Sequence, residues 1–164
     1  MGIIVDFSFQ TCLGSARARN FTNFLKNQSE FADMLSHILG KMIVELSTKE
    51  LKEISHNRAY HTHLLGNKTN LAIDVLREIL KNEFDYEKED AERWLDNNGI
   101  FLQKLWQISC PDSHGIRLIG FFQDDLHFRI LFIDYYHQIY PDEKNNQENI
   151  EANEFSALKK LKGR

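Results

Sequence analysis

Cysteine is scarce in this chain of 164 residues, which contains only Cys12 and Cys110. Two distant thiols exclude a framework of several disulfides and are too few for a four-cysteine zinc site. Long hydrophobic runs are also missing: no segment approaches a membrane span, and "MGIIVDFSFQTC" is too short and too interrupted for a signal peptide. We therefore expect a cytoplasmic protein with no membrane partner.

The chain also lacks an excess of basic residues. Its 20 Lys and Arg are outnumbered by 24 Asp and Glu, which gives a net charge of −4. Dedicated nucleic-acid binders usually carry a basic excess, because contacts to phosphate supply most of their affinity. Any nucleic-acid site must therefore be a local patch. The P-loop, G-x-G-x-x-G, G-x-S-x-G and H-E-x-x-H signatures are absent as well.

Hydrophobic residues are plentiful enough, at 42%, to form the core of one domain over residues 1–164. Apolar residues recur at helical spacing from Ser29 to Leu46, and similar patterns predict helices near 16–26, 70–80 and 86–97. A strand is expected at 3–9, and residues 103–134 read as a three-stranded antiparallel meander. We predict an α+β fold in which an N-terminal strand and several helices pack on a C-terminal antiparallel sheet of three to four strands.

Histidines gather in "HNRAYHTHLLG", residues 56–66. On an extended segment His61 and His63 would project from one face, with Cα atoms about 6.5–7 Å apart, a spacing at which both could ligate one metal. His56 or His137 could supply a third ligand, with Asp134 as a carboxylate. The structural alternative is a polar surface loop.

A second polar segment, "FRILFIDYYHQIYPDEK" at 128–144, begins as a strand and ends with tyrosines and a histidine. Functional groups often lie where a rigid strand gives way to a loop. We expect His137 and Tyr140 to join the histidines of 56–66 in one composite site. The alternative is that the tyrosines only cover the edge of the sheet.

Two arginines, Arg117 and Arg129, lie in neighbouring predicted strands. If these strands pair about a turn at 123–126, the two guanidinium groups approach each other, and their repulsion would favour a bound anion between them. Arg58 adds a third cation within the histidine segment. The alternative is that the strand arginines are simply solvated.

The runs "KLWQIS", "GIRLIGFF" and "FRILFIDYYHQIY" resemble the central antiparallel sheet of RelE/ParE-like toxins, over about residues 103–141. In that family a strand of the type xLWELR leads to one containing YRLLY and then to one that ends in a basic or aromatic catalytic segment. The resemblance implies that Arg117 holds the position of the family's sheet arginine and that His137 and Tyr140 follow the last strand. The chain departs from the family in its length and in the acidic "DYYHQIYPDE".

These patterns favour a toxin-like, metal-independent endoribonuclease or RNA-binding protein that needs no cofactor. RNA cleavage requires a base, an acid and a cation that stabilises charge on phosphorus. The catalytic candidates are His61, His63, His137, Arg117 and Tyr140, and the anion-binding candidates are Arg58 and Arg129. One alternative is a non-catalytic interaction protein (an immunity, antitoxin-like or phage accessory factor) whose acidic face binds a protein partner. A second is a small metal-dependent hydrolase that uses His61 and His63. The sequence indicates no oligomeric state.

Overall fold

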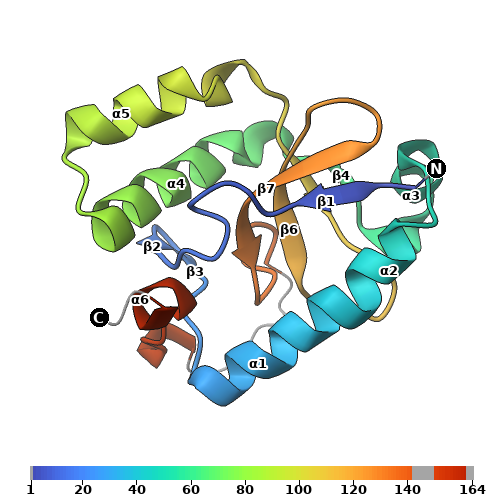
Figure 1. Ribbon diagram of the computed structural model, residues 1–164, viewed down its shortest axis with the longest axis horizontal. Helices are drawn as coiled ribbons and strands as arrows, with labels where there is room; N and C mark the ends of the chain where they lie inside the picture. Colours follow the sequence, from blue (N-terminus) through green and yellow to red (C-terminus); the bar gives the residue numbers. More distant parts are fainter. Residues whose placement is uncertain (1, 142–149, 162–164) are drawn as a thin grey trace.

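The computed structural model describes residues 2–141 and 150–161 and has at its centre a mixed five-stranded sheet (Figure 1). The strand order is β1-β7-β6-β5-β4. β4 to β7 pair antiparallel, and β1 joins β7 in parallel. The strands are β1 (Ile4–Asp6), β4 (His63–Leu64), β5 (Trp106–Ile108), β6 (Arg117–Phe122) and β7 (His127–Asp134). The predicted α+β fold is confirmed, including the meander in residues 103–134.

Helices account for most of the remaining regular structure. The predicted helix at 29–46 is confirmed: α1 continues through a π-helical turn into α2 (Figure 1). Its N-cap is Asn27 rather than Ser29, because the side chain of Asn27 accepts the backbone N–H of Glu30. The helices are α1 (Gln28–His37), the π turn (Ile38–Met42), α2 (Ile43–Leu46), α3 (Leu51–His56), α4 (Thr69–Phe84), α5 (Lys88–Asn97) and α6 (Ala157–Leu161). Single 3₁₀ turns lie at Arg58–Tyr60, Gly66–Lys68, Ile100–Leu102 and Ile150–Ala152.

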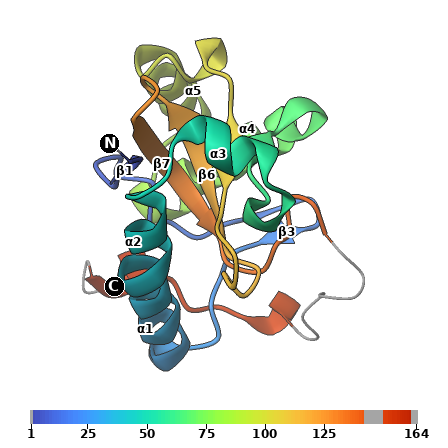
Figure 2. The same ribbon diagram turned by 90° about the vertical axis from the view of Figure 1, so that its right-hand side faces the viewer.

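The sheet separates two apolar cores. The α4–α5 pair covers one face, where Leu76 and Ile119 belong to one buried cluster. The α1–α2 helix covers the other face, where Met42 and Leu118 belong to a second cluster (Figures 1 and 2). Alternation along β6 explains this division, because Leu118 and Ile119 point to opposite sides of the sheet. None of the helices in residues 2–141 and 150–161 is long and apolar enough to cross a membrane.

The helix predicted near 16–26 is wrong. This segment forms a hairpin of β2 (Arg17–Ala18) and β3 (Phe21–Thr22), and its turn contains Arg19 with φ of 54°. The cause lies in Asn23, which is fully buried. Its side chain accepts the N–H of Ala16 and donates to the carbonyl of Ile133, at 2.8 and 2.9 Å. The bond to Ile133 of β7 and the bond to Ala16 together outweigh a weak local preference for helix.

Candidate acid–base site at the end of the sheet

Polar side chains cross the sheet in one row where β7 ends. The register pairs Arg117 of β6 with Asp134 of β7, and it places Ser109 opposite Arg117 one residue beyond the Ile108–Leu118 pair. β4 pairs His63 with Gln107 in antiparallel register. Continued by two residues, this register places His61 opposite Ser109. Because side chains alternate between faces, this row lies on the face that α4 and α5 cover.

Arg117 is buried at the centre of this row, with 4% of its surface exposed. Its Nη1 donates to the hydroxyls of Ser109 and Ser113, at 3.2 and 3.1 Å, and to the carbonyl of Ile116. Its Nε has no hydrogen-bond partner among the described residues. A guanidinium group so enclosed acts on a surface ligand through its charge rather than through direct contact.

Asp134 is the fully buried carboxylate of the row. Burial raises its pKa to about 6, although the charge of Arg117 and hydrogen bonds from backbone N–H groups oppose the rise. The two carboxylate oxygens accept the N–H groups of Gln138 and Ile139, both at 2.8 Å. Asp134 therefore holds the turn that brings Tyr140 back over the sheet.

His61 ends the row at the open edge of the sheet. It is exposed and has a left-handed backbone, with φ of 46°, and its carbonyl accepts the side-chain amide of Gln107 at 2.8 Å. The pKa of His61 is lowered, first by partial desolvation and then by the positive charges of Arg117 and His63. At neutral pH the ring is thus held in its neutral form, which can accept a proton.

His63 lies beside Tyr140, with ring centroids 5.0 Å apart and planes at 73°. Its Nδ1 is 2.8 Å from the carbonyl oxygen of Leu64. Because a carbonyl only accepts, Nδ1 carries the hydrogen and Nε2 carries the lone pair of the neutral ring. The hydroxyl of Tyr140 donates to the carbonyl of Leu65, and Lys68 Nζ lies 5.8 Å from the tyrosine ring centroid. The predicted meeting of the two polar segments is confirmed, although residues 142–144 of the second lie outside the described part.

His137 stands in the same turn as Tyr140 and also has a left-handed backbone, with φ of 57°. A Cβ built on Gly115 would lie 3.9 Å from that of His137, so the turn touches the loop between β5 and β6. Arg58 is exposed at the start of the 3₁₀ turn that precedes His61. Each residue lies three positions along the chain from a member of the row, His137 after Asp134 and Arg58 before His61. Their predicted roles stay predictions.

The predicted proximity of Arg117 and Arg129 is wrong. Arg117 pairs with Asp134, whereas Arg129 pairs with Phe121, further along the same two strands. The Nε of Arg129 is 3.3 Å from a carboxylate oxygen of Asp6, and its guanidinium lies 4.1 Å from the ring centroid of Phe9. The register, which the turn sequence alone does not set, thus separates the two arginines: Arg129 pairs with Asp6, whereas the bonds of Arg117 go to hydroxyls and a backbone carbonyl.

Two further arrangements bear on the alternatives. Among the described residues no group of three or more His, Cys, Asp and Glu side chains could hold a metal ion, so the His61/His63 pair has no third ligand of these types there.

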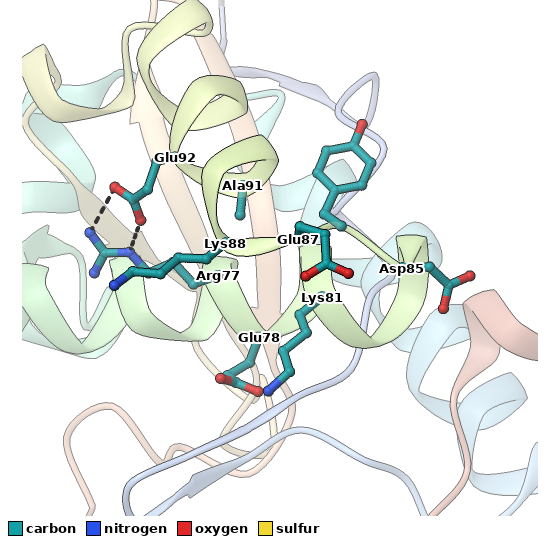
Figure 3. A pocket seen from close by; sticks show the side chains of 9 residues that line it. Arg77, Glu78, Lys81, Asp85, Glu87, Lys88, Ala91 and Glu92 are labelled. Carbon is teal, nitrogen blue, oxygen red and sulfur yellow. Dashed lines mark hydrogen bonds and ion pairs between the residues drawn. The ribbon is translucent and has the colours of Figure 1, made fainter.

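A separate pocket lies between α4 and α5 (Figure 3), where Arg77 Nε donates to Glu92 at 2.5 Å. Its lining is Arg77, Glu78, Lys81, Asp85, Tyr86, Glu87, Lys88, Ala91 and Glu92, which includes no histidine or cysteine.

Sequence reasoning missed Lys68, because a single surface lysine forms no motif. Its position two residues after Gly66, in the turn that closes the histidine segment, was the only available signal.

Comparison with known proteins adds a family but no activity. No curated protein and no solved structure matches the chain. A family model described as "Uncharacterised protein UU032" matches residues 8–163, and the chain therefore belongs to the UU032 family.

Proposed function

We propose that the end of the sheet around His61 and His63 is an acid–base site that cleaves RNA without a metal ion. The observation that carries this proposal is the grouping of two imidazoles, a tyrosine and a lysine on one edge, with a buried guanidinium group behind them. Acid–base catalysis of phosphodiester cleavage needs this set of groups. The resemblance to RelE/ParE-like toxins implies the same reaction.

In the proposed reaction His61 is the base. Its neutral ring takes the proton of the ribose 2′-hydroxyl, and the 2′-oxygen attacks phosphorus. The bond from phosphorus to the 5′-oxygen breaks, and protonated His63 gives that oxygen its Nε2 proton. The products are a 2′,3′-cyclic phosphate and a free 5′-hydroxyl. Lys68 stabilises the additional negative charge on the phosphoryl oxygens. Partial desolvation and then the buried charge of Arg117 lower the pKa of His61 and so favour its neutral form.

The test compares RNA cleavage, with chelator present, by the wild type, His61→Ala and His63→Ala. Loss of a general acid or base typically slows such reactions by about 10²- to 10⁴-fold. His127→Ala is the matched control, because the side chain of His127 is 44% exposed but lies at the opposite end of β7, paired with Asp124. Equal activity of all four proteins on every RNA tried would end the enzyme proposal, and stoichiometric bound zinc in the purified protein would end the metal-free form of it.

A second candidate function, binding of a basic protein partner, has one observation in its favour. The surface of α5 carries exposed carboxylates, which are Glu87 at its N-cap, Glu89, Asp90 and Asp96. Acidic surfaces of this kind steer association with basic partners. Reversal of charges on α5 would abolish such binding and leave RNA cleavage by the site at β4 unchanged.

A further inference from the structure

The edge of the sheet at β4 and β5 differs in charge from the rest of the chain. Residues 54–73 and 97–111 contain no aspartate or glutamate, although the whole chain has 24. The same two segments carry Arg58, Lys68 and Lys104, together with the histidines of 56–63. We call residues 54–73 and 97–111 the acid-free edge. Carboxylates of other segments border this edge on one side, where Glu50 and Asp125 line a pocket with His56 and Trp106. Away from that pocket, segments without carboxylates are where a polyanion meets the least repulsion on an acidic protein.

The fold brings the two segments of the acid-free edge together. β4 pairs with β5, and the N–H of Leu65 donates to the carbonyl of Leu105 at 2.9 Å. Lys104, which is exposed, immediately precedes Leu105 in the chain. Lys68 lies three residues after Leu65. β4 is the outermost strand of the sheet, so this edge is not covered by another strand of the described fold.

Exposed apolar side chains lie on the same edge. Leu64, Phe101 and Leu102 are 44%, 46% and 90% exposed. They are half of the large apolar residues that are exposed in the described part. Phe101 and Leu102 end the 3₁₀ turn that leads through Lys104 into β5. Exposed aromatic rings interleaved with cations are the means by which proteins hold single strands, because bases stack on the rings and phosphates meet the cations.

We propose that the acid-free edge binds single-stranded RNA and leads it to His61 and His63. In this arrangement Lys68 and Lys104 meet phosphates, and Phe101 stacks on a base. The inference rests on the proposed function for its catalytic end, but binding along the edge is measured separately. A duplex fits poorly, since its bases are stacked inside and cannot reach Phe101.

A protein strand added to β4 is the less suitable occupant. β4 is only two residues long, whereas strand addition draws its affinity from a row of main-chain hydrogen bonds. The carbonyls of Leu64 and Leu65 already accept hydrogen bonds from His63 and Tyr140. The chemistry that is left exposed on the edge is cationic and apolar, which suits nucleotides.

The experiment measures binding without cleavage. The probe is a fluorescent single-stranded RNA of about 12 nucleotides, with 2′-O-methyl groups throughout so that the 2′-oxygen cannot attack. Anisotropy titrations at several salt concentrations compare wild type, Lys68→Glu/Lys104→Glu and the control Lys81→Glu/Lys88→Glu. The control makes the same change in charge, but its lysines line the α4–α5 pocket beside Glu78 and Glu87 (Figure 3).

We expect the edge variant to bind at least about tenfold more weakly, and the slope of log affinity against log salt to fall by about 1.4, which corresponds to two lost phosphate contacts. The control variant should stay close to the wild type. Phe101→Ala should weaken binding by about tenfold through lost stacking, with no change in the salt slope. Leu39→Ala, an equally exposed apolar residue on the α1–α2 helix, is its control.

Equal weakening by the edge and control variants would overturn the proposal, as would equal affinity for duplex RNA. Failure of the wild type to bind would overturn it too and make a protein partner at α5 the better account. The two proposals fail separately. If the edge variant loses binding while His61→Ala cleaves normally, only the catalytic proposal fails. If His61→Ala and His63→Ala lose cleavage while the edge variant binds normally, only the binding edge fails.

Discussion

Replacement of Arg117 by methionine should destabilise the protein, and the loss should grow as the pH rises. Methionine fills a similar elongated space, but it removes the positive charge next to Asp134 and the hydrogen bonds to Ser109 and Ser113. Arg117 is 4% exposed and Asp134 is fully buried, so water cannot compensate for either loss. Removal of one partner from a directly bonded buried ion pair typically costs about 3–5 kcal/mol. Arg117 and Asp134 face each other in the register without a direct ion pair between their side chains, so we expect a loss below that range.

The pH dependence follows from the pKa of Asp134. Burial raises this pKa from 3.8 to about 6, so the folded protein binds the proton more tightly than the unfolded chain does. The wild type therefore loses stability as the pH rises from about 4 to about 6, and Asp134 contributes no further change above that range. Without Arg117 the pKa of Asp134 rises further, and the variant continues to lose stability above pH 6. The gap between the two proteins should widen by at most about 1.4 kcal/mol per pH unit.

The assay is urea unfolding, followed by the fluorescence of Trp94 and Trp106, at several values between about pH 6.5 and about pH 8. The double variant Arg117→Met/Asp134→Asn removes the titrating group, so its difference from the wild type should not change over this range. A deficit of Arg117→Met that is the same at every pH would refute the reasoning, because it would show that Arg117 does not compensate the charge of Asp134.

Three further outcomes can be measured on single variants. Ile38→Asp, which places a carboxylate in the core beneath the π turn, should cost several kcal/mol in thermal unfolding, whereas Leu39→Asp on the exposed side should cost little; equal effects would contradict the burial. Gly120→Ala should lower the melting temperature, because its Cβ would lie 1.9 Å from a carbonyl oxygen of β7, and an unchanged value would contradict that close approach. Desolvation and then the neighbouring His114, whose ring centroid is 4.7 Å away, lower the pKa of His37. The stability that His37 contributes in its neutral form is therefore lost as the pH falls below about 6.5. His114→Ala should raise the pKa of His37 in an NMR titration, and no change would contradict the contact.

The elements that the sequence predicts well are those with a strong period of their own. The helix at 29–46 and the strands of the meander show their buried faces directly. The segment 16–26 misleads, because Phe21, Phe24 and Leu25 have the spacing of a helical face. Its hairpin depends on the bond from Asn23 to Ile133, 110 residues away, and local patterns hold no information on that contact. The same is true of the parallel pairing of β1 with β7.

The candidate site was partly predictable for the same reason. The shared polarity of 56–66 and 134–140 predicts that the two segments meet, and the contact of His63 with Tyr140 bears out their proximity. That most of 134–140 is buried was not predicted. The environment of Arg117 was not predictable, since it depends on register, and the β6–β7 ladder has an irregularity between Ile119 and Gly120. Lys68 belongs to no motif, and only its position in the turn after Gly66 singles it out.

Backbone strain gives a further reason to prefer a functional role for this end of the sheet. Of the six non-glycine residues with positive φ in the described part, four lie in the loops around Arg117 and Asp134: His61, Asp112, His114 and His137. Left-handed backbones at such residues typically cost about 1 kcal/mol or more each, and the buried pair adds a desolvation cost. A loop that only covered the sheet edge could avoid the backbone strain with glycine residues and the desolvation cost with apolar residues in place of the buried charges. Strain and buried charge that coincide beside two histidines fit the acid–base proposal better than a covering role for the tyrosines.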